Sequence, residues 1–138
     1  MITRCNNKMK NFLDLVNTQE RKVVAIDFDG VIHKNSKGFY DGTIYDDPID
    51  GSIEAIKSLA EDYDVVIFSC KALPDRPLIE EKTGITLIEE WLDKYGIFHC
   101  VKEVTWEKPR AFLYIDDKGY RFENWQDTIG FIENLKGV

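Results

Sequence analysis

Cysteine and histidine are scarce in this chain, which has three cysteines and two histidines among its 138 residues. The odd number and wide spacing of Cys5, Cys70 and Cys100 argue against a disulfide framework and favour free thiols in a reducing cytoplasm. A nucleophilic Cys70 is also disfavoured, because no histidine that could activate its thiol lies nearby in the sequence.

Long apolar runs and an excess of basic charge are absent as well. No run approaches the length of a membrane span, and the amino terminus lacks an apolar segment of signal-peptide length. The net charge of −7 argues against a membrane or a non-specific nucleic-acid partner, since both need a basic surface. The composition fits a soluble globular protein, and the length predicts a single domain over residues 1–138.

Apolar runs and helical spacing alternate along the chain. Strands that alternate with helices pair in parallel through right-handed crossovers. We therefore predict an α/β fold: a three-layer Rossmann-like domain with a small parallel sheet flanked by helices, an N-terminal helical extension at 1–21 and no large cap domain. The patterns place strands at Val23–Ile26, 64–69, 97–101 and 111–115, and helices at 7–19, 53–63, 88–95 and 125–135.

The segment 33–47 has no sustained period and is rich in glycine, aspartate, asparagine, serine and tyrosine. This composition is typical of a loop or small hairpin, and we interpret it as a flap beside the end of the first strand. We expect His33 on the surface of this flap. The large aromatic side chains of the other elements are expected in the core: Trp91, Phe112, Trp125 and Phe131.

The strand from Val23 to Ile26 runs directly into Asp27 and Asp29, with Gly30 next. The carboxyl end of such a strand is where an open α/β sheet places its ligand crevice. Two carboxylates there must be solvated, hydrogen-bonded or neutralised by a cation, and hard oxygen ligands suit Mg²⁺. Taken alone, the run has a simpler explanation as a buried strand followed by an Asp-Gly turn.

Three later features extend this pattern. The strand 64–69 ends in Ser69, the strand 111–115 runs into Asp116 and Asp117, and Lys108 lies eight residues before Asp116. Each feature has an ordinary structural explanation: a strand-end hydroxyl bonded to nearby backbone, a turn, and a solvated lysine. Together and in this order they resemble the haloacid dehalogenase superfamily of phosphohydrolases, and the match spans roughly residues 22–122.

The resemblance implies a Mg²⁺-dependent phosphatase that hydrolyses a phosphate monoester through an aspartyl-phosphate intermediate. It makes Asp27 the nucleophile and Asp29 the general acid and base, whose proton is retained if acidic neighbours raise its pKa. It further implies a phosphoryl contact from Ser69 and charge neutralisation by Lys108.

The resemblance also implies a metal site and a phosphate cradle. Mg²⁺ would be held by Asp27, the Asp29 backbone carbonyl and Asp117, with Asp116 supporting Lys108; the roles of the two adjacent aspartates could be reversed. The free amides expected in the cradle are those from Phe28 to Gly30 and at Cys70, with Lys71 as a further substrate-binding residue. Many small relatives carry an arginine at the position of Lys71, and a lysine lacks that bidentate fork.

The sequence leaves the substrate and its mode of access open. The gaps that hold cap domains in the resembled family are short here, so we expect a capless member with an open site, which a partner subunit or the 33–47 flap could close. Capless members often act on large or polymeric phosphoesters, which makes a nucleic-acid end a candidate substrate. The other candidates are a nucleotide, a sugar phosphate or another small phosphorylated molecule. The alternative is a non-catalytic protein that binds a phosphorylated ligand. A phosphoacceptor signalling domain fits the order of the motifs poorly.

Overall fold

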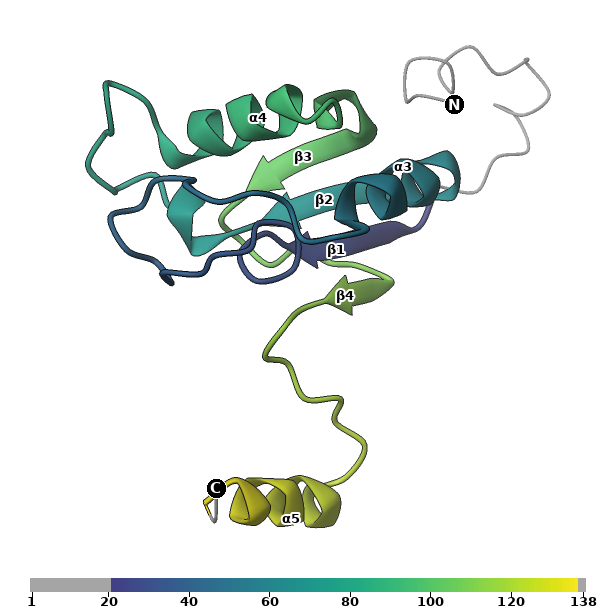
Figure 1. Ribbon diagram of the computed structural model, residues 1–138. Coiled ribbons are helices and arrows are strands. Elements are labelled where there is room, and N and C mark those ends of the chain that lie inside the picture. Colours follow the sequence, from purple (N-terminus) through teal and green to yellow (C-terminus); the bar gives the residue numbers. More distant parts are fainter. Residues whose placement is uncertain (1–20, 137–138) are drawn as a thin grey trace, which may run out of the picture.

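The centre of the molecule is a sheet of four parallel strands (Figure 1), seen in a computed structural model that describes residues 21–136. The strands lie in the order β3-β2-β1-β4, so β1 has a neighbour on each side. This confirms the predicted α/β class with a parallel sheet, while the helix predicted at 7–19 lies outside the described residues. The strands are β1 (Val23–Asp27), β2 (Asp64–Phe68), β3 (Val101–Thr105) and β4 (Leu113–Ile115).

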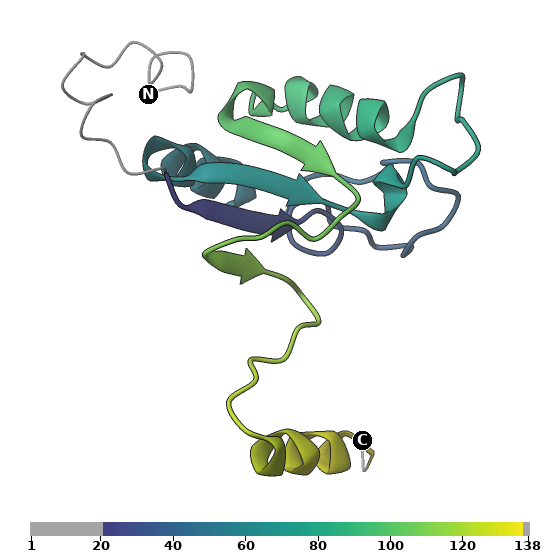
Figure 2. The same ribbon diagram turned by 180° about the vertical axis from the view of Figure 1, so that it is seen from behind.

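Two amphipathic helices, α3 (Ser52–Asp62) and α4 (Gly84–Lys94), connect the strands β1, β2 and β3. Both lie behind the sheet in Figure 2, on the same face. This follows because the connections from β1 to β2 and from β2 to β3 are right-handed and advance across the sheet in the same direction. Alternate strand residues point toward them, because successive side chains of a strand point to opposite faces. The resulting core contains Val24, Ile26, Val65 and Ile67 from the strands and Ile56, Ile88 and Leu92 from the helices.

Helix α4 begins in close contact with the short 3-10 helix η1 (Cys70–Ala72) that follows β2. A Cβ atom on Gly84 would collide with the backbone carbonyl of Lys71, so only glycine allows this approach. The Thr83 hydroxyl caps the helix by accepting a hydrogen bond from the Thr86 amide at 3.2 Å. The start of α4 therefore fixes the backbone of Lys71, which lies at the functional site described below.

The strand predicted at 97–101 is wrong in its bounds. Residues Phe98–Cys100 form a 3-10 helix, η2, and the strand β3 begins at Val101. Helix α4 ends before Gly96, which has a left-handed φ of 75°, and Ile97 and Cys100 are then both buried. A spacing of three between buried residues is that of a 3-10 turn rather than of a strand.

The C-terminal helix α5 (Trp125–Lys136) stands apart from the sheet, at the end of a segment that leads away from β4 (Figures 1 and 2). Of the four aromatic residues expected in the core, only Trp91 is buried, with 6% of its surface exposed. Phe112, Trp125 and Phe131 are 58%, 67% and 45% exposed, so their predicted burial is wrong. Helical spacing predicts an apolar face, but it does not reveal whether another element packs against that face.

Candidate functional site

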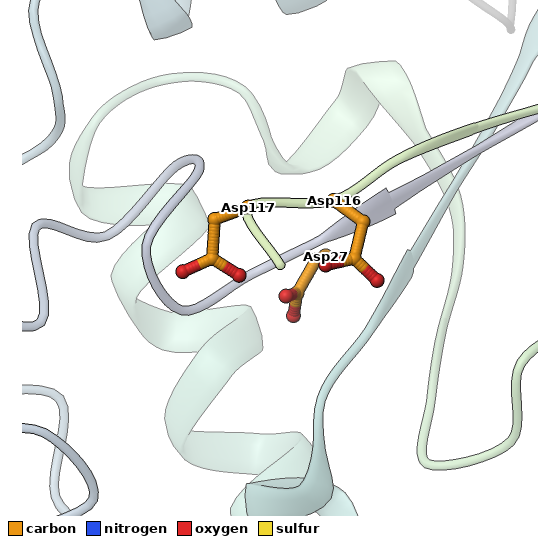
Figure 3. A group of neighbouring side chains, drawn as sticks. All are labelled: Asp27, Asp116 and Asp117. Carbon is orange, nitrogen blue, oxygen red and sulfur yellow. The ribbon is translucent and has the colours of Figure 1, made fainter. Parts of the chain in front are cut away.

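Three carboxylates meet at the carboxyl edge of the sheet. Asp27 is the last residue of β1, and Asp116 and Asp117 follow β4 directly. They come together because β1 and β4 are paired, with Ile26 opposite Ile115. One ligand oxygen from each aspartate lies within 4.8 Å of the others (Figure 3). We refer to these residues as the carboxylate triad. An all-oxygen donor set of this kind suits a hard divalent cation such as Mg²⁺.

The triad places negatively charged carboxylates around Asp27. Burial, and then the charges of Asp116, Asp117 and Asp29, raise the pKa of Asp27 to about 7, and a hydrogen bond with Asp117 acts in the same direction. Each of these causes disfavours the ionised form. A bound cation would reverse the effect, because it would attract the ionised carboxylates that now repel one another. The electrostatics of the triad therefore fit a metal ion.

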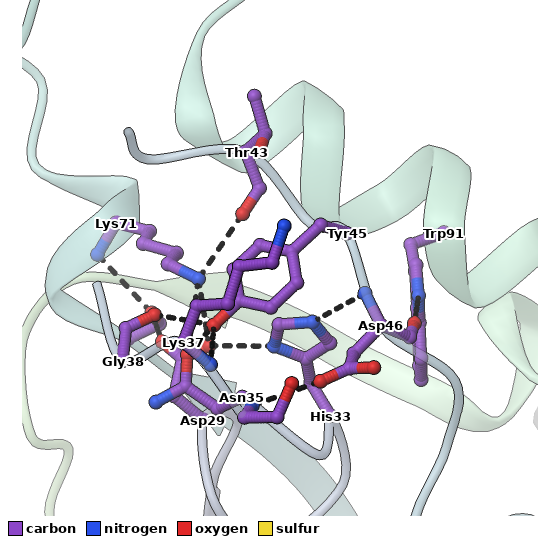
Figure 4. Close-up of polar contacts among 12 residues, drawn as sticks. Asp29, His33, Asn35, Lys37, Gly38, Thr43, Tyr45, Asp46, Lys71 and Trp91 are labelled. Atoms are coloured by element: carbon purple, nitrogen blue, oxygen red, sulfur yellow. Dashed lines mark hydrogen bonds and ion pairs between the residues drawn. The ribbon is translucent and has the colours of Figure 1, made fainter. Parts of the chain in front are cut away.

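Asp29 faces a different environment, formed mostly by hydrogen-bond donors (Figure 4). Its Oδ2 accepts a hydrogen bond from the Ser69 hydroxyl at 2.9 Å. Its Oδ1 lies 3.1 Å from the Lys71 ammonium and 3.0 Å from Nδ1 of His33. Both partners of Oδ1 are buried, Lys71 at 1% exposure and His33 at 0%. The expectation of a surface histidine at position 33 is therefore wrong.

These donors determine the protonation state of Asp29. Burial alone would raise its pKa, but hydrogen bonds from His33, Lys71 and Ser69, together with the charge of Lys71, outweigh burial and lower the pKa below the usual value. The sequence-based expectation that acidic neighbours raise this pKa is therefore wrong. The ammonium of Lys71 lies 3.1 Å from the carboxylate and favours its ionised form.

Lys71 joins the loop after β1 to the flap at 33–47. Besides Asp29, its ammonium contacts the Thr43 carbonyl at 3.2 Å and the Asn35 Oδ1 at 3.5 Å. The ring of Tyr45 lies beside the same ammonium, with 5.3 Å between Nζ and the ring centroid. Lys71 was expected to bind substrate, and in this structure its donors are used within the protein.

Ser69 makes the backbone contact considered for it and a second contact with Asp29, while its phosphoryl contact stays a prediction. Its hydroxyl accepts a hydrogen bond from the Lys71 amide at 3.1 Å, as a strand-end hydroxyl often does. The same hydroxyl donates to Asp29 and so lies beside the carboxylate expected to handle a proton. The Ser69 side chain therefore connects the end of β2 with the loop after β1.

Two amides of the expected phosphate cradle are already occupied. The Phe28 amide donates to the Phe68 carbonyl at 3.0 Å, and the Gly30 amide donates to the His33 carbonyl at 2.8 Å. They hold the loop after β1 in place and offer no free donor to a ligand. Cys70, which was also expected there, is an exposed residue with a free thiol at the start of η1.

Lys108 lies on the exposed surface near β4. Its ammonium is 4.5 Å from the centre of the Tyr114 ring, and among the ion pairs of residues 21–136 none joins Lys108 to a carboxylate. Lys108 and Asp116 nevertheless line one cavity of about 280 Å³, which also includes Arg121. Since Asp116 belongs to the triad, the cavity opens beside it.

Sequence reasoning missed the participation of His33, Asn35 and Tyr45. His33 follows Asp29 by four residues, and the turn between them brings the imidazole back to the carboxylate: the amides of Ile32 and His33 both donate to the Phe28 carbonyl at 3.0 Å. The glycine at position 30 and the polar flap indicated such a turn. They did not indicate that the histidine would point inward.

Comparisons with protein-family models, with curated proteins and with solved structures found no match. None of the helices in the described part of the chain combines the length and the apolar character needed to cross a membrane.

Proposed function

We propose that this protein is a Mg²⁺-dependent phosphatase that hydrolyses a phosphate monoester through an aspartyl-phosphate intermediate. The observation that carries the proposal is the placement of two different carboxylate environments at one sheet edge. The triad of Asp27, Asp116 and Asp117 offers carboxylate oxygens suited to a cation, whereas Asp29 is surrounded by hydrogen-bond donors. The order of these residues along the chain resembles that of the haloacid dehalogenase superfamily.

Asp27 is the proposed nucleophile. One of its carboxylate oxygens would attack phosphorus, forming an aspartyl-phosphate, while the bond between phosphorus and the leaving oxygen breaks and the alcohol departs. Water would then attack the phosphorus of the intermediate, releasing inorganic phosphate and regenerating the Asp27 carboxylate. Catalysis of this kind depends chiefly on positioning and on neutralisation of charge at the phosphoryl group.

Asp29 is the proposed proton carrier. In this structure it favours the ionised form, which is the form needed to accept a proton from the attacking water in the second step. In the first step it would need a proton to donate to an alkoxide leaving group. A leaving group that is stable as an anion, such as nitrophenolate, does not depend on that donation.

The metal would be held by Asp27, Asp116 and Asp117, and the Asp29 backbone carbonyl is expected as a further ligand. When bound, Mg²⁺ would supply positive charge that offsets the carboxylates and the phosphoryl oxygens. Ser69 would contact the phosphoryl group, and Lys108 would add positive charge from the neighbouring cavity.

We infer further that the domain belongs to the Rossmann-like type without a large cap, and that it acts in the cytoplasm. The free Cys70 and Cys100 thiols support the second point. An uncapped site would admit a nucleotide, a nucleic-acid end or a sugar phosphate. It is also compatible with a homo-oligomer in which a partner subunit closes the site.

The test is hydrolysis of p-nitrophenyl phosphate with Mg²⁺ and with excess chelator, using wild type, Asp27→Asn and Asp62→Asn. Asp62 is an exposed aspartate at the end of α3 and serves as a matched control for the charge change. We expect activity only with Mg²⁺, its loss in Asp27→Asn and its retention in Asp62→Asn. Phosphate-dependent stabilisation without turnover of any phosphorylated metabolite or oligonucleotide would instead support the alternative of a binding protein.

A further inference from the structure

A chain of hydrogen bonds runs from helix α4 through the flap to Asp29 (Figure 4). The Trp91 indole Nε1–H donates to the Asp46 carbonyl at 3.0 Å. The Asp46 amide donates to Nε2 of His33 at 3.0 Å. Nδ1 of His33 lies 3.0 Å from Oδ1 of Asp29. Three side chains and one residue of backbone thus connect the hydrophobic core to the proposed proton carrier.

The partners of His33 select one tautomer of its ring. A backbone amide only donates, so Nε2 must accept with its lone pair and carry no proton. The ring proton of neutral imidazole is then on Nδ1, where it is donated to the Asp29 carboxylate. The opposite tautomer would place two donors against each other at Nε2 and leave no donor for Asp29.

Packing fixes the orientation of the ring as well as its tautomer. The His33 ring stacks on Phe28, with the centroids 5.4 Å apart and an angle of 10° between the planes. The rings of Tyr45 and Trp91 meet it edge-on, at 5.0 and 5.9 Å. With no exposed surface, the ring is enclosed by aromatic neighbours that oppose its rotation.

From this geometry we propose that His33 is a positioning residue that holds the Asp29 carboxylate in one orientation and leaves a single oxygen for proton transfer. Oδ1 is occupied by His33 and Lys71, whereas among residues 21–136 Oδ2 accepts only from Ser69. A carboxylate oxygen has two acceptor positions, so the open position is on Oδ2. The proton is therefore accepted and donated at Oδ2. This inference rests on the proposed function for the role of Asp29.

Two amide substitutions separate the ends of the imidazole. His33→Asn places a side-chain N–H near the position of Nδ1 and can still donate to Asp29. His33→Gln reaches the position of Nε2 and loses that donor, and His33→Leu removes both ends. Loss of an orienting hydrogen bond around a catalytic group lowers activity by about 10–100-fold. We expect a loss of this size in kcat for the Gln and Leu variants, little change in KM, and substantial recovery in the Asn variant.

The dependence of activity on the leaving group distinguishes a positioning role from a merely structural one, which would lower activity equally for all substrates. The loss in His33→Gln should be larger for an alkyl phosphate than for p-nitrophenyl phosphate, because only the alkoxide needs a proton from Asp29. Equal losses in the Asn and Gln variants, with the same ratio for both substrates, would overturn the proposal. Thermal unfolding of each variant identifies any that fail to fold. If the Gln and Leu variants do not fold, the activity of His33→Asn is still compared with that of wild type.

Nitrogen-15 NMR of the imidazoles tests the arrangement without using activity. The chain has two histidines, so His99→Gln assigns the signals. We expect His33 of the full chain to give one protonated Nδ1 and one unprotonated Nε2, and we expect the Nδ1 signal to move in Asp29→Asn. A protonated Nε2 or a rapidly exchanging ring would overturn the proposal. If the NMR result is as expected but the protein has no phosphatase activity, the hydrogen-bonded arrangement of His33 stands and only the proposed function is rejected.

Discussion

A side chain on Gly30 would occupy the position of the Asp117 carboxylate. Gly30 has a left-handed φ of 86°, and a Cβ atom built on it would collide with Oδ2 of Asp117. The loop after β1 and the residue pair after β4 therefore approach each other as closely as the backbone of Gly30 permits. The triad depends on this absence of a side chain as much as on its three aspartates.

Gly30→Ala should weaken metal binding, and Gly51→Ala provides a matched control. Gly51 has a φ of 85°, so both variants incur the left-handed penalty of about 1–2 kcal/mol, but a Cβ on Gly51 would meet no atom of the described residues within 4 Å. We expect both variants to lose similar stability and only Gly30→Ala to lose Mg²⁺ affinity, measured by calorimetry. Unchanged affinity in Gly30→Ala would show that the triad does not form the metal site.

Asp27 should make the metal-free protein less stable as the pH rises. Its pKa is about 7 in the folded state, above the ordinary value of 3.8, so the folded state binds this proton more tightly than the unfolded state does. Its contribution to the free energy of unfolding is then complete below pH 3.8 and is lost as the pH rises through about 7. Denaturant titrations in chelator should show this slope in wild type and a smaller one in Asp27→Asn. Identical slopes would contradict the raised pKa.

Asp29→Asn should slow the second chemical step most clearly. An amide cannot accept a proton from water, whereas nitrophenolate departs without an acid. With p-nitrophenyl phosphate we therefore expect the phospho-enzyme to accumulate, detected as covalently bound phosphate after rapid acid quench. Equal losses with good and poor leaving groups, and no trapped intermediate, would remove the proton-transfer role from Asp29.

Lys71→Met should destabilise the fold strongly. The Lys71 side chain is 1% exposed and pairs with Asp29, which is 15% exposed, so its removal leaves a largely buried carboxylate without its cation. Breaking such a buried pair costs about 3 kcal/mol or more. The control is Lys82→Met, which breaks an exposed pair with Glu90 and should cost less than about 1 kcal/mol. In the background of Asp29→Asn the Lys71→Met penalty should shrink, and an undiminished penalty would show that the two residues are not coupled.

The sheet and the triad could be predicted because they follow from local patterns. Runs of valine and isoleucine indicate buried strands, and parallel strands place their carboxyl ends at one edge, so Asp27, Asp116 and Asp117 had to converge. The surroundings of Asp29 could not be predicted in the same way. They depend on how the flap folds back over η1 and brings Thr43 to Lys71, a contact between distant residues that no period in the sequence encodes.

The position of α5 also bears on how much of the chain the sheet and the triad require. The segment from Lys118 onward leads away from the sheet, and Thr128 is the one buried residue in the helix. The sheet and the triad are complete at Asp117, so we expect them to form without the C-terminal helix. A chain shortened after Glu123 should therefore unfold at nearly the same temperature as the full chain and retain its Mg²⁺ affinity. A large loss of thermal stability would show instead that α5 packs on the sheet in solution.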